Sequence, residues 1–238
     1  MLQPKALAFD VFGTVVDWRE GVAREAARWL AALGRSDVDA HAFADAWRRR
    51  YQPKLEEVRS GRRPFVVLDV LHREALEEVL RSQGVDPDEA GEPRLAELTL
   101  AWHRLDPWPD VVEGLTRLKR RFPIVTLSNG NVALILDMAR RASLPWDAVL
   151  GAEFSRAYKP LPEAYLATSR ALALAPGELC LVAAHHSDLA AARACGLLTA
   201  YISRPDEYGG APAPDADAAQ DWDWKASSLT SLADLLGC

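Results

Sequence analysis

The chain has 238 residues, of which 49% are hydrophobic, and it carries a net charge of −6. This length allows one large domain or a domain with an insertion, and the composition supplies a sizeable core. The negative charge argues against nucleic acid and anionic membranes as partners, and we interpret short basic runs such as Arg48-Arg49-Arg50 as solvated helix faces.

Five short apolar or β-rich runs predict strands, and most of them are separated by helical patterns. This alternation is typical of an α/β fold, in which right-handed crossovers connect the strands of a parallel sheet. A loop rich in Gly, Pro, Ala and Asp is expected at 206–217, before a closing helix at 228–236. The five predicted strands cover residues 7–11, 124–128, 148–150, 179–183 and 199–202.

One long stretch, residues 18–104, shows helical periodicity and no convincing strand. Asp17 and Glu20 can form a capping box at its start, and Gly34 ends the first helix. The sequence therefore predicts a helical cap at 18–104, inserted after the first strand. The remaining helices of this cap are expected over residues 39–57, 66–83 and 88–104, and the core is expected to consist of residues 1–17 and 105–238.

Asp10 follows the first apolar run, and a Gly13-Thr14 turn comes shortly after it. A carboxylate at the C-terminal end of a buried parallel strand lies where open α/β sheets bind ligands, and it can act there as a nucleophile. Two positions after Asp10 the chain has Phe12, whose side chain cannot carry a proton. The segment therefore predicts a nucleophilic aspartate without a second acid beside it.

Three further polar motifs accompany the later strands. Thr-Leu-Ser-Asn-Gly at 126–130 ends the second strand, and Tyr158-Lys159-Pro160 precedes a helix. His185-His186-Ser187-Asp188 follows the strand at 179–183. Each motif alone is compatible with an ordinary turn or helix start. Their occurrence together, in order and on the C-terminal side of the strands, predicts one shared site.

These motifs resemble those of the haloacid dehalogenase superfamily, and the match to its L-2-haloacid dehalogenase (type II) branch is close. The core resemblance covers residues 5–17 and about 105–204, and the helical insertion lies where that family carries its cap. The resemblance implies a Rossmann-like parallel sheet core with an inserted all-helical cap. It also implies hydrolysis of short 2-haloalkanoic acids, such as haloacetates including fluoroacetate or L-2-haloacids, to 2-hydroxy acids.

Two departures from the phosphatases of the superfamily favour halide over phosphate. Where those enzymes have a second Asp that protonates the leaving group, this chain has Phe12. Where they usually have a Gly-Asp or Asp-Asp pair for Mg²⁺, it has residues 183–187 (Ala-Ala-His-His-Ser). A hard divalent cation needs several oxygen ligands, and Asp10 and Asp188 alone are few. We therefore expect a displacement without metal or cofactor.

The resemblance also implies roles for the core residues. Asp10 attacks the halogen-bearing carbon to form an aspartyl ester, which water then hydrolyses. Lys159 keeps Asp10 ionised, because a nearby ammonium lowers the pKa of a carboxylate. Thr14 supplies a hydroxyl donor to the site. The substrate carboxylate is expected to be held by the Ser128 hydroxyl and the backbone N–H groups of Val11 and Phe12.

Four other residues have both a functional and a structural interpretation. Asn129 faces the departing halide or only forms a turn, and Tyr165 lines the pocket or only packs. Asp188 stabilises Lys159 or positions the hydrolytic water, and it also caps a helix. His185 orients water or acts as a base near neutral pH, or else is a supporting histidine.

The cap residue that grips the halide or the carboxylate is harder to place. Type II enzymes use an arginine, and the best-aligned position here is His41, with Arg35 the nearest basic residue before it. Both residues are also compatible with a solvated helix end. Phe65 is the candidate for an apolar wall.

The expected partner is a small haloacid, and the dimers common among relatives imply a homodimer. The three cysteines have no spacing typical of disulfide frameworks or zinc sites, and neither a signal peptide nor a run of about 20 apolar residues is visible. We therefore expect a cytoplasmic protein. Two alternative functions remain: a Mg²⁺-dependent phosphatase of the same superfamily and a non-catalytic binding protein on this fold.

Overall fold

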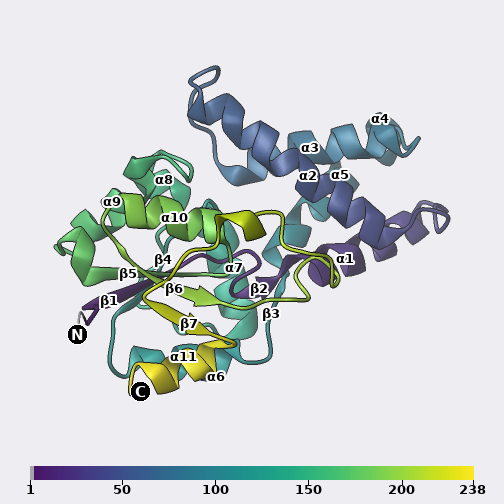
Figure 1. Ribbon diagram of the computed structural model, residues 1–238. Coiled ribbons are helices and arrows are strands. Elements are labelled where there is room, and N and C mark those ends of the chain that lie inside the picture. Colours follow the sequence, from purple (N-terminus) through teal and green to yellow (C-terminus); the bar gives the residue numbers. More distant parts are fainter. Residues whose placement is uncertain (1–2) are drawn as a thin grey trace.

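A five-stranded parallel sheet forms the centre of the protein, whose computed structural model describes residues 3–238 (Figure 1). The strand order is β4-β1-β5-β6-β7, and each neighbouring pair is parallel. The predicted α/β fold with a Rossmann-like parallel sheet is therefore confirmed. Its strands are β1 (Ala6–Phe9), β4 (Ile124–Thr126), β5 (Leu179–Ala183), β6 (Leu198–Ile202) and β7 (Trp224–Ala226).

Amphipathic helices cover both faces of this sheet. Side chains alternate along β1, so that Leu7 and Phe9 join one apolar cluster while Ala6 and Ala8 join the other. In Figure 1, α9 and α10 lie above the sheet, and α6 and α11 lie below it. The core helices are α6 (Val111–Lys119), α7 (Val132–Ala142), α8 (Ala152–Ser155), α9 (Pro162–Ala171), α10 (His186–Ala194) and α11 (Leu229–Leu235), with short 3-10 turns η2 (Pro176–Glu178) and η3 (Ala216–Ala218).

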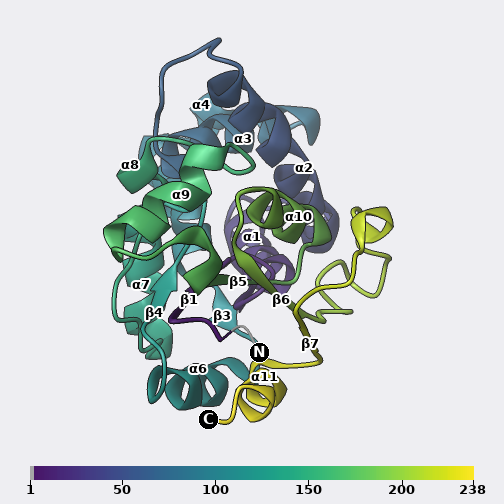
Figure 2. The same cartoon turned by 60° about the vertical axis from the view of Figure 1, so that its left-hand side comes forward.

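The helical stretch begins and ends at a pair of short antiparallel strands. In this pair, β2 (Val16–Asp17) lies beside β3 (Asp106–Pro107), so the chain leaves the sheet region and returns at the same place. Figure 2 shows α2, α3 and α4 gathered at one end of the molecule. No helix within residues 3–238 is long and apolar enough to cross a membrane. The helices of this stretch are α1 (Trp18–Ala32), α2 (Ala40–Arg59), α3 (Leu68–Ser82), α4 (Pro87–Ala90), α5 (Glu92–Thr99) and η1 (Leu100–His103).

The local sequence explains where these helices begin and end. The Asp17 carboxylate accepts the N–H of Glu20 at 3.1 Å and so caps α1, but the Glu20 side chain contacts His41 and does not complete the predicted capping box. The single helix expected over 88–104 is instead divided into α4, α5 and η1. Gly91 lies between α4 and α5 with φ 83, a left-handed conformation that interrupts helical hydrogen bonding.

Two details of the sheet differ from the prediction. The run at 148–150 is not a strand, because only Ala148 forms an isolated bridge, with Val125. The N–H of Leu150 instead donates to the side chain of Thr126 at 2.8 Å. The edge strand β7 was not predicted, because its three residues follow a long polar loop. Both differences lie at the edges of the sheet, and the three central strands were predicted.

Candidate active site

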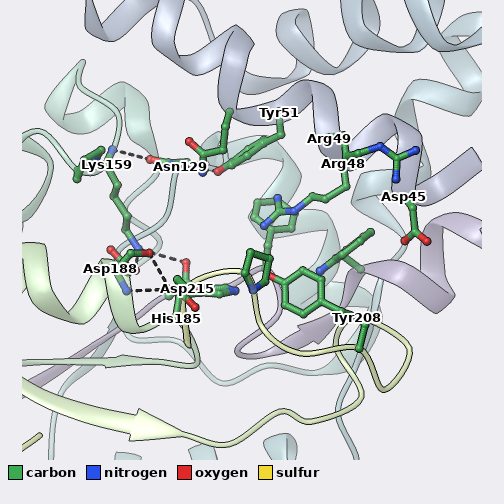
Figure 3. Close-up of a pocket in the computed structure, with 18 of the residues that line it drawn as sticks. Asp45, Arg48, Arg49, Tyr51, Asn129, Lys159, His185, Asp188, Tyr208 and Asp215 are labelled. Carbon is green, nitrogen blue, oxygen red and sulfur yellow. Dashed lines mark hydrogen bonds and ion pairs between the residues drawn. The ribbon is translucent and has the colours of Figure 1, made fainter. Parts of the chain in front are cut away.

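The predicted core residues converge at the carboxyl ends of the parallel strands (Figure 3). Asp10 follows β1, and Asn129 follows β4. Asp188 lies in the first turn of the helix that follows β5, whose N-cap residue is His185 and not Asp188 as predicted. Lys159 reaches them from the turn before α9. These side chains line a cavity of about 780 Å³, which helix α2 and the loop after β6 complete. This is where an open α/β sheet binds its ligands.

Asp10 is buried and receives hydrogen bonds on both carboxylate oxygens. Lys159 Nζ lies 3.2 Å from Oδ1, while Thr14 Oγ1 donates to Oδ2 at 2.7 Å. His185 Nδ1 lies 3.1 Å from the same Oδ2. Burial alone would raise the pKa of Asp10, but Lys159 and His185 outweigh it and hold this pKa well below its usual range. Asp10 is therefore ionised in the free protein.

Lys159 joins Asp10 to a second buried carboxylate. Its Nζ lies 2.6 Å from Asp188 Oδ2, and the Tyr165 hydroxyl donates to Asp188 Oδ1 at 2.7 Å. Burial opposes the charge on the ammonium, but Asp10 and Asp188 raise the pKa of Lys159 above its usual value. The amine therefore stays charged, and its position is fixed from both sides.

The backbone around the nucleophile leaves donors unused. Thr14 Oγ1 accepts the N–H of Ala184 at 2.9 Å, which ties the Asp10 loop to the end of β5. Ser128 Oγ accepts the N–H of Gly130 at 3.0 Å. The N–H groups of Val11 and Phe12 donate to no group among residues 3–238. Val11 and Ser128 are not among the residues that line the cavity, so a contact of theirs with a substrate stays a prediction.

Phe12 forms an apolar part of the cavity beside Asp10. Its ring meets the edge of the Trp102 ring, with centroids 5.9 Å apart, and is 3% exposed. No proton can be supplied from this position. Within residues 3–238, no cluster of three or more His, Cys, Asp or Glu residues is arranged to hold a metal ion.

Glu207 is a site residue that the sequence did not predict. It follows β6 in a segment we expected to be only a loop, yet its side chain is almost completely buried. Its Oε1 lies 2.9 Å from His185 Nε2 and accepts the Trp18 Nε1–H at 3.0 Å. Burial would lower the pKa of His185, but the carboxylates of Glu207 and Asp10 raise it well above its usual value.

Arg48 is the second site residue that the sequence missed, because we interpreted its basic run as a solvated helix face. The guanidinium stacks over the ring of Tyr51 at 4.3 Å and over that of Trp18 at 5.3 Å. Its Nη1 is shielded from solvent and has no hydrogen-bond partner in the part of the chain described. Figure 3 shows Arg48 and Tyr51 extending from α2 into the cavity, opposite Lys159 and Asp188.

Asn129 connects the two sides of the cavity. Its Nδ2 donates to the Tyr51 hydroxyl at 2.9 Å, and its Oδ1 accepts the backbone N–H of Lys159 at 2.8 Å. Asn129 therefore holds helix α2 against the turn that carries Lys159. The side chain is more than a turn former, while its contact with a halide stays a prediction.

Three residues predicted to touch the substrate do not line the cavity, so the structure does not support that prediction for them. Arg35 is bound to Asp37 at the end of a helix, with Nε 2.9 Å from Oδ1. His41 lies near the exposed start of α2, with Nε2 2.9 Å from Glu20 Oε1. Phe65 packs against the ring of Tyr158, with centroids 5.4 Å apart. None of the three residues lines the cavity.

Comparison with known proteins agrees with this geometry. Residues 4–196 match the family model of haloacid dehalogenase-like hydrolases. (S)-2-haloacid dehalogenase 4A of Burkholderia cepacia is 31% identical over 87% of this chain and 88% of its own. A crystal structure of a defluorinating L-2-haloacid dehalogenase superposes with a TM-score of 0.96 at 50% identity, covering 99% of this chain and 96% of that one.

A further solved structure carries a covalently bound haloacid. It is the L-2-haloacid dehalogenase from Xanthobacter autotrophicus with chloropropionic acid covalently bound, which has a TM-score of 0.81 and 25% identity and covers 99% of both chains. The family match spans most of this chain, and the relatives match nearly all of it. This chain therefore belongs to the haloacid dehalogenase-like hydrolases and, within them, to the L-2-haloacid dehalogenase branch.

Proposed function

We propose that this protein hydrolyses short L-2-haloalkanoic acids to 2-hydroxy acids through an ester on Asp10. The observation that carries the proposal is the ionised Asp10 carboxylate, which lies at the cavity wall between Lys159 and His185 with apolar Phe12 beside it. The relatives named as (S)-2-haloacid dehalogenases and as a haloacetate dehalogenase, from Moraxella, support the same substrate class.

The first step is an SN2 displacement. One Asp10 oxygen attacks the carbon that bears the halogen, the carbon–halogen bond breaks, and the halide leaves with the electron pair. Lys159 keeps the nucleophile charged and aimed. A halide leaves without a proton, so Phe12 can occupy the position where a leaving-group acid would otherwise be needed.

The second step is hydrolysis of the ester. Water attacks the carbonyl carbon of Asp10, and the ester bond to the substrate oxygen breaks, which frees the hydroxy acid and restores the carboxylate. The free N–H groups of Val11 and Phe12 lie next to Asp10 in the chain and are suited to the oxygen that becomes negative. Neither step requires a metal, and Lys159 already neutralises the charge between Asp10 and Asp188.

Arg48 takes the role that we had assigned to His41 or Arg35. A charged guanidinium nitrogen that is shielded from solvent is costly unless a hydrogen-bond acceptor or an anion pairs with it. The unpaired Nη1 of Arg48 therefore favours binding of the substrate carboxylate or of the departing halide. Because Arg48 stacks on Tyr51 and Trp18, its position is set before the substrate arrives.

The helical stretch then acts as a cap. We assign residues 18–104 to a cap domain and residues 1–17 and 105–238 to the catalytic core, of which residues 1 and 2 lie outside the described structure. Arg48 and Tyr51 from this cap complete the site. The three free cysteines support a cytoplasmic location. The resemblance supports a homodimer, which light scattering would test.

Halide release tests the proposal directly. Chloroacetate, fluoroacetate and each enantiomer of 2-chloropropionate would be incubated with the protein in EDTA, with Asp10→Asn as the control. We include fluoroacetate because the relative with 50% identity is described as defluorinating. Halide release by the wild type alone supports the proposal. Phosphate release from a phosphomonoester with Mg²⁺, without halide release, would contradict it.

A further inference from the structure

His185 lies between two carboxylates that can only accept hydrogen bonds when ionised. Nδ1 is 3.1 Å from Asp10 Oδ2, and Nε2 is 2.9 Å from Glu207 Oε1. A neutral imidazole has one N–H and could satisfy only one of these contacts. The arrangement therefore requires a doubly protonated, positively charged His185 in the free protein, in agreement with its raised pKa.

Glu207 is held firmly in the position that this contact needs. Oε1 also accepts the Trp18 Nε1–H at 3.0 Å. Gly13 approaches from the nucleophile loop so closely that a Cβ placed there would lie 2.2 Å from Oε1. Since the side chain of Glu207 is only 3% exposed, solvent competes little for its oxygens.

The other charged groups around His185 come from several elements. The titratable Tyr208 follows Glu207 in the loop after β6. Burial would raise the pKa of Glu207, but His185 and, to a smaller extent, Arg48 from α2 lower it. Lys159 contacts Oδ1 of Asp10, whereas His185 contacts Oδ2, so the Asp10 carboxylate lies between the two positive charges. Glu207 and Asp10 are therefore the two negative charges in direct contact with the imidazole.

We propose that Glu207 is a positioning residue for ester hydrolysis, which holds His185 by Nε2–H so that Nδ1 faces the Asp10 ester and acts as the base. This inference rests on the proposed function, because it needs an ester on Asp10. This role explains why the buried Glu207 carboxylate contacts His185 at Nε2, while Nδ1 faces Asp10. The arrangement follows the general logic of a carboxylate that orients a catalytic imidazole.

The protons balance over one turnover. When Asp10 becomes an ester it loses its negative charge, so His185 keeps only Glu207 as an ionic partner and releases the Nδ1 proton through the cavity. The neutral Nδ1 then takes a proton from water as the water oxygen bonds to the ester carbon. Collapse breaks the ester bond, and the departing alkoxide takes the second proton of that water. Asp10 returns as carboxylate and His185 as imidazolium, so each cycle releases one proton and one halide.

The test separates the two chemical steps in the full-length protein. Glu207→Gln keeps the side-chain shape but removes the charge, and the introduced amide can donate to Nε2 and so favour the wrong tautomer. Glu163→Gln, an exposed residue paired with Arg170, is the matched control. Rapid quenching after mixing with 2-chloropropionate would follow halide release, and intact mass would follow the ester on the protein.

We expect Glu207→Gln to release one halide per site in a burst, to accumulate the ester, and to hydrolyse it at least about 10-fold more slowly, within the range of general base catalysis. Ester hydrolysis should rise with pH as His185 loses its proton. The midpoint of that rise should move to lower pH in Glu207→Gln by about 1 unit, because a negative neighbour has been removed. A purely structural role would slow the reaction without moving the midpoint.

An unchanged rate and midpoint of ester hydrolysis in Glu207→Gln would overturn the inference while the wild type still releases halide. Failure of the proposed function would look different, because the wild type itself would then release none. Should Glu207→Gln fail to fold, His185→Gln provides the second test. It should trap the ester after one turnover, and hydrolysis at the wild-type rate would overturn the inference.

Discussion

The ammonium of Lys159 lies 3.2 Å from the Asp10 carboxylate, and both groups are buried. On its other side the same nitrogen contacts Asp188. The Lys159 charge thus stabilises two buried carboxylates that would otherwise repel each other, and His185 adds a second positive charge beside Asp10. The nucleophile remains ionised for this reason, although burial alone would favour its neutral form.

Lys159→Met should remove activity and weaken the fold together. Asp188 would remain buried without its cation while Asp10 retains His185, and removal of one partner from a buried ion pair costs about 3–5 kcal/mol. Urea unfolding and halide release would measure the two effects. Lys225→Met, the control, makes the same substitution at an exposed lysine and should change the unfolding free energy by less than about 1 kcal/mol. Equal stability of the two variants would contradict this account of Lys159.

Arg48→Met should have a different combination of effects, with weaker substrate binding and a smaller loss of stability than Lys159→Met. A charged hydrogen bond contributes about 1.5–3 kcal/mol, so KM should rise about 10-fold or more. The free protein loses the stacking of Arg48 on Tyr51 and Trp18, but the guanidinium it loses also has an unpaired Nη1. Arg50→Met, from the same basic run but outside the cavity lining, is the control. An unchanged KM for Arg48→Met would place the anion site elsewhere.

Gly13→Ala should inactivate the protein more than its backbone strain explains. Its φ of 83° is left-handed, and the new Cβ would meet Glu207 Oε1 at 2.2 Å. Gly34→Ala has a similar φ of 71° but no neighbour within 4 Å, so it measures the backbone cost alone. That cost is about 1–3 kcal/mol for each variant in urea unfolding. Full activity of Gly13→Ala would show that Glu207 does not need its present position.

His103 should make stability depend on pH through a contact between the helical stretch and the core. Its Nε2 lies 3.1 Å from Asp69 and its Nδ1 lies 2.7 Å from Asp137. Burial alone would lower the pKa of His103, but these carboxylates raise it above 6.5. The charged contact is thus complete below about pH 6.5 and is lost as pH rises through the raised pKa.

His103→Gln measures this contribution. The difference in unfolding free energy between wild type and His103→Gln should be larger at pH 6 than at pH 9. Urea unfolding at both pH values would provide the measurement. A difference that grows with pH would show that His103 is uncharged in the folded protein.

Much of the core site could be predicted because parallel strands bring their carboxyl ends together. Asp10, Asn129 and Asp188 are far apart in the chain, yet each comes after a strand of the sheet, and Lys159 joins them at the same edge from the turn before α9. No side chain from outside this edge was needed to infer a nucleophilic site.

Arg48 and Glu207 could not be predicted in the same way. A charged residue on a helix or in a polar loop has the same local pattern whether it faces solvent or a cavity. Its role depends on how the helical stretch and the loop after β6 fold back over the sheet. His41 and Arg35 were chosen by alignment and position, but both pair with acidic residues outside the cavity.

The most direct test of the central claim is a single turnover in water labelled with oxygen-18, with the protein in excess over L-2-chloropropionate. If Asp10 is the nucleophile, the hydroxyl oxygen of the product comes from the unlabelled carboxylate, and the heavy isotope appears in the peptide that contains Asp10. Label in the product hydroxyl, with none in the protein, would mean that water displaces the halide directly and would contradict the account.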